Sequence, residues 1–279
     1  MRQIEIAPGL PTASILGLGC SRLGSMTSEH SPAEARKLVT AALSLGVTLF
    51  DTSNIYAQGR SEQILGQALQ GRRDVSIVTK AGQVFPLKHR LLSPLKGPVS
   101  ALLKHSRSAQ AGVRAARSQG LPRNYSPEHL KTALEASLRR LRRTEVEAFL
   151  LHSPRIEHIS DGVALDALTG LKQSGKARTV GVSVDDESVL ERVADDPRVD
   201  VIQAPFGIAR RAFESSLARA SARGALIIAR EVLSADAGVT RPSPADAVRF
   251  STGHPHVMFT LVGTGNIDHL RQAVEAARH

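Results

Sequence analysis

Short runs of apolar residues alternate with longer segments of helical periodicity along most of this 279-residue chain. The apolar runs are rich in Val, Ile, Leu and Ala, and their length is typical of strands. The segments between them have the spacing of helices with one buried face. This alternation predicts parallel strands that are joined by helical crossovers.

Eight candidate strands can be counted, and each is followed by a candidate helix. The strands are expected at residues 13–19, 47–51, 75–80, 146–152, 179–183, 201–203, 226–230 and 257–263. The helices are expected at residues 32–45, 61–69, 127–142, 162–173, 188–194, 211–223, 244–251 and 267–277, with Ser31 and Ser126 as N-caps of two of them. Eight such units predict one α/β domain over residues 1–279, a closed (β/α)8 or TIM barrel. A doubly wound sheet is the alternative, but GLGCSRLG near Gly17 lacks the GxGxxG spacing.

Two segments fall outside the alternation. Residues 1–10 are expected to form a short hairpin that seals the bottom of the barrel, with Pro8 and Gly9 at its turn. Residues 81–125 are too long for an ordinary loop between a strand and a helix, so a functional insertion on the catalytic face is expected after the third strand.

The charge of the chain is concentrated in that insertion. The formal net charge is +10, but residues 81–125 hold eight basic and no acidic residues, so the remainder carries only +2. The basic residues are Lys88, Arg90, Lys96, Lys104, Arg107, Arg114, Arg117 and Arg123. They form either a solvated helix face or a positive rim that steers an anionic substrate or cofactor. Nucleic acid is not an expected partner, because Phe85 and Tyr125 are the segment's only aromatic residues for base stacking.

Other features of the composition exclude several classes of protein. Cys20 is the single cysteine, and no Cys and His residues cluster at metal-ligand spacing, so neither a disulfide nor a metal site is expected. No signal-peptide pattern and no membrane-length apolar run occurs, so a cytoplasmic protein without a membrane partner is expected. The oligomeric state is left open, and a monomer fits the sequence.

Polar residues at strand ends carry the candidate chemistry. Asp51, Lys80 and His152 end the second, third and fourth predicted strands, and Tyr56 follows Asp51 by five residues. In a barrel these ends face the catalytic site. A phenol normally titrates near 10, and an adjacent ammonium is expected to lower that pKa by roughly 1 to 3 units. The group suits proton transfer to a carbonyl oxygen that His152 orients, while a cofactor delivers hydride.

The chain also resembles a known family. The segments that carry the resemblance are GVTLFDTSNIYAQGRSEQILGQAL, VSIVTK, YSPEHLKTALEASLRRLRRTEVEAFLLH, GKARTVGVS, VIQ and VGTGNIDHL. Together they resemble the aldo-keto reductase superfamily. The resemblance implies reduction of a small aldehyde or ketone to an alcohol, or the reverse, with NADPH favoured and NADH as the alternative. It implies that Tyr56 is the general acid, that Lys80 and Asp51 tune it, and that His152 orients the carbonyl.

The resemblance further implies where a cofactor would bind. The residues expected around the nicotinamide end are Asp51, Ser183 and Gln203, and further expected cofactor contacts are Gly19, Cys20, Ser21 and Arg230. Those expected at the adenosine phosphate are Gly263, Thr264, Gly265, Asn266 and His269, which follow the last strand and open a helix.

Several positions depart from the family pattern. Val184 replaces an Asn whose amide reaches the nicotinamide, and Arg230 replaces an aromatic residue that stacks on the ring. His269 replaces an Arg that contacts the 2′-phosphate, and Ala273 an Asn that reaches adenine. These departures leave open a barrel that binds nucleotide as a regulatory or sensor protein with little turnover. A barrel aldolase that uses Lys80 as a Schiff-base nucleophile is a further alternative, which Asp51 disfavours because it would keep Lys80 protonated.

Overall fold

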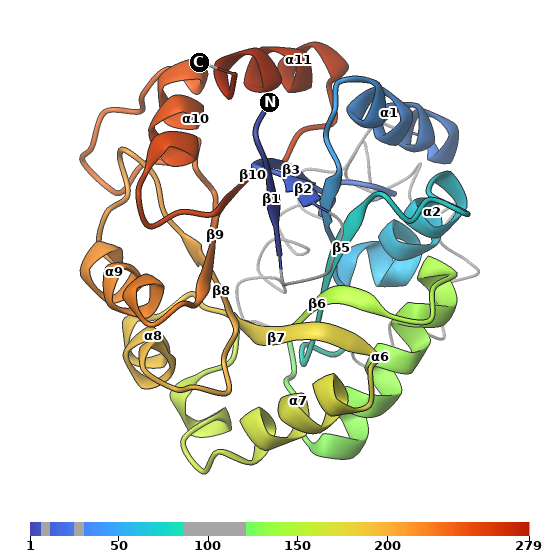
Figure 1. Ribbon diagram of the computed structural model, residues 1–279, viewed down its shortest axis with the longest axis vertical. Coiled ribbons are helices and arrows are strands. Elements are labelled where there is room, and N and C mark those ends of the chain that lie inside the picture. The colour runs from blue at the N-terminus through green and yellow to red at the C-terminus, as the bar shows by residue number, and fades with distance from the viewer. Residues whose placement is uncertain (7–11, 25–30, 86–120, 279) are drawn as a thin grey trace, which may run out of the picture.

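The computed structural model describes residues 1–6, 12–24, 31–85 and 121–278. Eight of its strands form a closed barrel: β3 (Leu16–Gly19), β4 (Leu49–Asp51), β5 (Ser76–Ala81), β6 (Val146–His152), β7 (Ala177–Ser183), β8 (Val201–Pro205), β9 (Leu226–Arg230) and β10 (Phe259–Val262). Each strand is parallel to the next along the chain, and β10 pairs with β3 to close the barrel. The predicted (β/α)8 barrel is confirmed (Figure 1).

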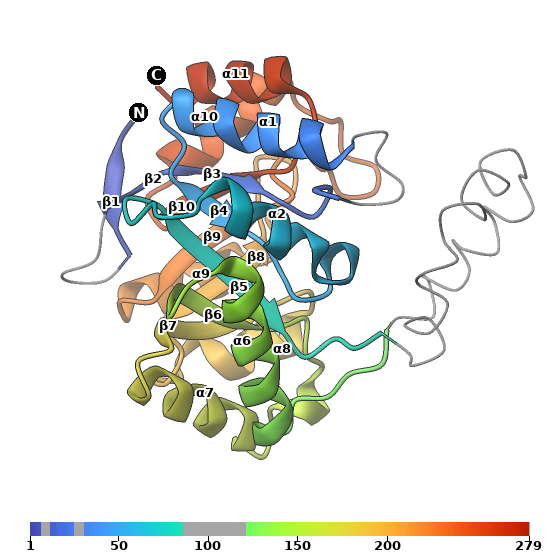
Figure 2. The same cartoon turned by 90° about the vertical axis from the view of Figure 1, so that its right-hand side faces the viewer.

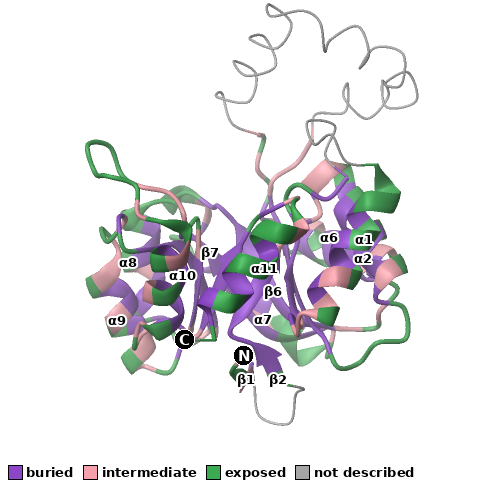
Figure 3. Cartoon of the chain, turned by 90° about the horizontal axis from the view of Figure 1, so that it is seen from above, coloured by how far each residue is buried: buried purple, intermediate pink, exposed green. Residues whose placement is uncertain are grey.

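Helices cover the outside of the barrel. They are α1 (Pro32–Ser44), α2 (Arg60–Ala68), α6 (Pro127–Leu141), α7 (Val163–Gln173), α8 (Glu187–Ala194), α9 (Glu214–Ala222), α10 (Pro244–Gly253) and α11 (Ile267–Ala276). Ser31 and Ser126 cap α1 and α6 as expected, each accepting a hydrogen bond from a backbone N–H of the first turn. The helices bury the face toward the strands and expose the other, as Figure 3 shows. In the part of the chain that is described, no helix is both long and apolar enough to cross a membrane.

The N-terminal hairpin differs from the prediction in its extent. β1 (Gln3–Glu5) pairs antiparallel with β2 (Thr12–Ser14), so residues 13 and 14 belong to the hairpin and not to the first barrel strand. The chain bends at Ile15, where the hydroxyl of Ser14 donates to the carbonyl of Leu16 (2.7 Å). The sequence of residues 13–19, which is compatible with a single strand, gave no sign of this bend. The expected turn at Pro8 and Gly9 lies outside the described residues.

The hairpin closes the end of the barrel at which the strands begin (Figure 2). Ile6 and Ala13 pack in one cluster with the apolar side chains of the barrel interior. That cluster includes Leu49, Val78, Leu150, Val201 and Ile228. The predicted seal at the barrel bottom is therefore confirmed.

A polar layer lies directly above this apolar one. Because side chains alternate along a strand, the residue two positions further on points into the same interior. Those residues are Asp51, Lys80, His152, Gln203 and Arg230. The apolar layer thus excludes water from below, and the barrel geometry gathers the polar side chains of five different strands at its carboxyl end.

The insertion after the third barrel strand is described only at its two ends. Gln83 and Arg123 form an antiparallel bridge, so the chain leaves and re-enters the barrel at neighbouring points. Residues 86–120, with seven of the eight basic residues, lie outside the described part of the chain. The two interpretations of that basic segment therefore stay predictions.

Candidate active site

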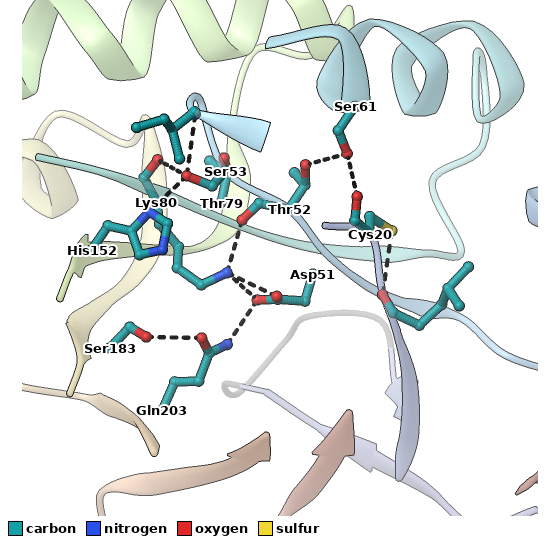
Figure 4. Close-up of polar contacts among 12 residues, drawn as sticks. Cys20, Asp51, Thr52, Ser53, Ser61, Thr79, Lys80, His152, Ser183 and Gln203 are labelled. Atoms are coloured by element: carbon teal, nitrogen blue, oxygen red, sulfur yellow. Dashed lines mark hydrogen bonds and ion pairs between the residues drawn. The ribbon is translucent and has the colours of Figure 1, made fainter. Parts of the chain in front are cut away.

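The side chains of Asp51 and Lys80 form a buried ion pair between neighbouring strands β4 and β5. Nζ of Lys80 donates to Oδ1 and Oδ2 of Asp51 at 2.6 and 2.8 Å, and to the carbonyl of Thr52 at 2.9 Å (Figure 4). These contacts use all three protons of the ammonium. Burial acts most strongly against the charged form, yet Asp51 and Tyr56 hold the pKa of Lys80 above its ordinary value. Lys80 is therefore a fixed cation.

Tyr56 lies beside this pair, at the start of the 3-10 helix η1 (Tyr56–Gly59). The centroid of its half-buried ring is 5.2 Å from Nζ of Lys80 and 5.6 Å from the ring centroid of His152, in an edge-on arrangement. Burial raises the pKa of the Tyr56 phenol above its ordinary value, and the opposing effect of Lys80 is smaller. The net shift is opposite to the expected lowering. The phenol consequently keeps its proton at neutral pH.

His152, the last residue of β6, is neutral. Its Nδ1 lies 2.9 Å from Oγ of Ser53, while its Nε2 has no hydrogen-bond partner among the described residues. Burial and then the nearby cations Lys80, Arg230 and Arg123 hold the pKa of His152 well below its ordinary value. Nε2 is therefore free for a ligand.

Residues 121–125, where the chain returns to the barrel, hold the backbone around His152 by hydrogen bonds. The hydroxyl of Tyr125 donates to the carbonyl of His152 (2.7 Å), and Nε of Arg123 donates to the carbonyl of Ser153 (3.1 Å). Gly82 makes room for this tyrosine, because a Cβ there would lie 1.9 Å from Cε1 of Tyr125. Tyr125 therefore anchors the backbone of His152.

Ser183 and Gln203 extend the polar chain to β7 and β8. Oγ of Ser183 donates to Oε1 of Gln203 at 3.0 Å, and Nε2 of Gln203 donates to Oδ1 of Asp51 at 2.7 Å. Both side chains are fully buried. The expected nicotinamide end is therefore hydrogen-bonded directly to the ion pair of Asp51 and Lys80.

Arg230 is held by three partners at the end of β9. Nη2 donates to the carbonyl of Val184 (2.8 Å), and the guanidinium forms ion pairs with Asp185 and Glu231. Only 17% of the side chain is exposed. The two departures from the family pattern, Val184 and Arg230, thus contact each other, and the charge of Arg230 is compensated by two carboxylates.

A cavity of about 560 Å³ opens at the other expected cofactor region, between β10, α10 and α11. Gly263, Thr264 and His269 line it, together with Arg22 and Ala273. Gly265 and Asn266 do not line it. Asn266 instead caps α11, with Oδ1 accepting from the backbone N–H groups of Asp268 (2.7 Å) and His269 (3.3 Å). Its side-chain oxygen therefore bonds the backbone at the start of the helix.

Three candidate residues, Gly19, Cys20 and Ser21, lie at the end of β3 and directly after it, and they differ in their contacts and exposure. Gly19 lies against Gly263, since a Cβ on Gly19 would be 3.4 Å from the Cα of Gly263. Ser21 is exposed. Cys20 is completely enclosed, its thiol donates to the carbonyl of Leu18 (3.3 Å), and burial above all raises its pKa. The expected contact of Cys20 with a cofactor stays a prediction.

Sequence reasoning missed the two residues that follow Asp51. The carbonyl of Thr52 accepts from Lys80, and the hydroxyl of Ser53 contacts His152. Both lie in the FDTSNIY motif, between two residues that were singled out. Two polar residues directly after a strand end were the available signal. Among the described residues, no group of three or more His, Cys, Asp or Glu side chains could hold a metal ion.

Residues 15–237 match the sequence profile of the Aldo/keto reductase family. The chain is 28% identical over 226 residues to the NADH-specific methylglyoxal reductase of Escherichia coli strain K12, a match that covers 78% of this chain and 62% of that protein. Two other curated relatives are covered over 57% and 54% of their length. The chain therefore spans less than two thirds of the curated relatives that it matches.

Solved structures share the fold. An aldo-keto reductase from Bacillus halodurans in its holo form superposes with a TM-score of 0.77 at 22% identity, covering 100% of this chain and 91% of that one. An aldo-keto reductase from Klebsiella pneumoniae in complex with NADPH superposes with a TM-score of 0.67 at 23% identity, covering 96% and 87%. At these identities the likeness establishes the barrel alone.

Proposed function

The chain belongs to the aldo/keto reductase family, and on this premise we propose that it reduces an aldehyde or ketone to the alcohol with a nicotinamide cofactor. One observation carries the proposal. A protonated phenol, Tyr56, lies beside the fixed cation Lys80 and edge-on to the neutral imidazole of His152, at the carboxyl end of the barrel strands. This is the set of groups that protonation of a carbonyl oxygen requires.

In the proposed reaction the carbonyl oxygen lies between the hydroxyl of Tyr56 and Nε2 of His152. Tyr56 gives its proton to that oxygen as negative charge develops on it. Lys80 stabilises the phenolate that forms, and Asp51 keeps Lys80 charged and in place. A bound nicotinamide supplies the hydride to the carbonyl carbon. The alcohol then carries the hydride on carbon and the tyrosine proton on oxygen.

The residues present fit such a cofactor. Gln203 has one amide proton left after its bond to Asp51, so it could still donate to the nicotinamide carboxamide. At the other end, the cavity is lined by the backbone of Gly263, by Thr264 and by the basic side chains of Arg22 and His269, which suits a phosphorylated ribose. We propose NADPH as the preferred cofactor on this basis. The naming of the Escherichia coli relative as NADH-specific keeps NADH as the alternative.

A nucleotide-binding barrel with little or no turnover is the second candidate. It is favoured by Val184 and Arg230, which put an apolar side chain and a charge where the family pattern has an amide and an aromatic ring. A Schiff-base aldolase is disfavoured, because Lys80 is ion-paired at 2.6 Å and its pKa is held above the ordinary value.

Two measurements on the purified protein separate these functions. Fluorescence titration with NADPH and with NADH reports binding, and loss of NADPH absorbance with a panel of small aldehydes and ketones reports turnover. If the proposal is right, NADPH binds more tightly than NADH, and NADPH is oxidised only when a carbonyl compound is present. Binding without turnover on any carbonyl compound would support the sensor, and absence of binding to both nucleotides would refute both functions.

A further inference from the structure

The hydroxyl of Ser53 lies at a branch point with one proton to donate. Oγ is 2.9 Å from Nδ1 of His152 and 3.2 Å from the carbonyl oxygen of Lys80 (Figure 4). It is also 3.4 Å from Oδ1 of Asn54. It also accepts the backbone N–H of Ile55 at 3.3 Å. The hydroxyl can satisfy only one of the three acceptors at a time.

The imidazole of His152 also has two alternatives, because a neutral ring carries a single proton on either Nδ1 or Nε2. If Ser53 donates to Nδ1, the ring proton is on Nε2, which can then donate to a ligand. If Ser53 turns toward the carbonyl of Lys80, Nδ1 must carry the proton and donate to Oγ. Nε2 is then an acceptor only, and it repels a carbonyl oxygen.

The surrounding contacts favour the first arrangement. The carbonyl of Lys80 already accepts the backbone N–H of Asn54 at 3.1 Å, so it does not depend on Ser53. Nδ1 of His152 has no other partner among the described residues, and its distance to Oγ is the shortest of the three. Ser53 is itself buried, so water does not compete for its proton.

We propose that Ser53 is a positioning residue that donates to Nδ1 of His152 and thereby fixes the imidazole tautomer that presents an N–H to the substrate carbonyl. The inference rests on the proposed function, since only a carbonyl acceptor requires that N–H. Ser53 touches no substrate and acts through His152.

The experiment measures the tautomer directly, by 15N NMR of the full-length protein. The two ring nitrogens of His152 are assigned with a His152→Gln variant, because the chain has ten histidines. Wild type should show the proton on Nε2. Ser53→Ala should move His152 toward a mixture of tautomers, and Ser53→Thr, which keeps the hydroxyl, should restore the wild-type signals.

Ser76→Ala is the matched control, because Ser76 is a buried serine of β5 whose Oγ has no hydrogen-bond partner among the described residues. It should change neither the tautomer nor turnover. If carbonyl reduction is found, Ser53→Ala should lower kcat about tenfold, the scale of one hydrogen bond near a developing charge, with little change in KM. A proton on Nδ1 in wild type, or an unchanged tautomer in Ser53→Ala, overturns the inference even if no carbonyl compound is reduced.

Discussion

The carboxylate of Asp51 holds the ammonium of Lys80 with both of its oxygens, at 2.6 and 2.8 Å. Only 1% of the lysine side chain and 6% of the aspartate side chain are exposed. Removing one partner of such a pair leaves the other charge buried and uncompensated. The pair therefore keeps a cation in place beside Tyr56, and in the proposed reaction this cation would stabilise the phenolate of Tyr56.

Replacing Asp51 tests this relationship through stability. Asp51→Asn should lower the free energy of unfolding by about 3 to 5 kcal/mol, because Lys80 would lose its counter-charge in a buried setting. Lys80→Met alone should also destabilise, and the double variant should lose less than the two single losses added together. Urea unfolding of the four proteins measures this coupling.

The control for that cycle is an exposed pair. Arg72 and Asp74 lie 2.6 Å apart but are about half exposed, so Asp74→Asn should leave the free energy of unfolding almost unchanged. If the losses of unfolding free energy at Asp51 and Lys80 simply add, the two side chains do not stabilise each other as an ion pair.

The expected pH dependence of reduction follows from two groups whose pKa values are shifted, His152 and Tyr56. The pKa of His152 lies well below its ordinary value of 6.5, so the imidazole stays neutral near and above that pH. The pKa of Tyr56 lies above its ordinary value of 10.0, so the proton donor stays intact until alkaline pH. The rate of reduction should be flat between about pH 6 and about pH 9 and fall above that range.

The reverse oxidation should respond in the opposite way. It needs the phenolate of Tyr56 as a base, so its rate should keep rising with pH until the phenol is ionised. Both expectations are checked by measuring the rate against pH, at saturating substrate, for reduction and for oxidation. An inflection near pH 6.5 in either direction would mean that His152 titrates in the working range.

The cavity at α11 predicts a change in cofactor preference. His269→Arg introduces a permanent charge into a cavity that Arg22 already lines, so NADPH should bind roughly fivefold to tenfold more tightly, about 1 to 1.4 kcal/mol. Affinity for NADH, which lacks the 2′-phosphate, is the internal control and should hardly change. Equal tightening for both nucleotides would place the new charge elsewhere along the cofactor.

The anchor at Tyr125 should matter for both stability and rate. Tyr125→Phe keeps the ring, which packs over Gly82 and edge-on to His158, and removes only the donor to the carbonyl of His152. We expect a loss of about 1 kcal/mol in unfolding free energy and a severalfold lower kcat, because the backbone of His152 loses a contact. Thermal unfolding and steady-state kinetics of this variant check both effects, and an unchanged kcat would show that the contact does not position His152.

Much of the barrel could be predicted from the sequence, since its strands are short apolar runs with clear helical segments between them. The strands at Val146–His152 and Leu226–Arg230 have the predicted bounds. The division of the first apolar run into β2 and β3 could not be foreseen, because Ala13 to Gly19 are all compatible with one strand and the bend depends on pairing with Gln3–Glu5.

The approach of Asp51, Lys80, Tyr56 and His152 to one another also followed from the sequence, because each lies at or just beyond a strand end. Their catalytic roles stay predictions. The direction of the Tyr56 pKa shift was missed, since it depends on how deeply the ring is buried, and no motif encodes that depth. Ser53 was missed, and the capping role of the Asn266 side chain was not foreseen, for a related reason. Whether a polar side chain faces a ligand or its own backbone is decided by local geometry.

The proposed reaction depends on the transfer of a proton from Tyr56 to a carbonyl oxygen. The most direct measurement is the single-turnover rate of hydride transfer in Tyr56→Phe, with NADPH and an aldehyde that wild type reduces, alongside the Kd for NADPH. We expect a rate at least about a hundredfold lower than that of wild type with an unchanged Kd, because only the proton donor is lost. A rate equal to that of wild type would contradict the proposed reaction.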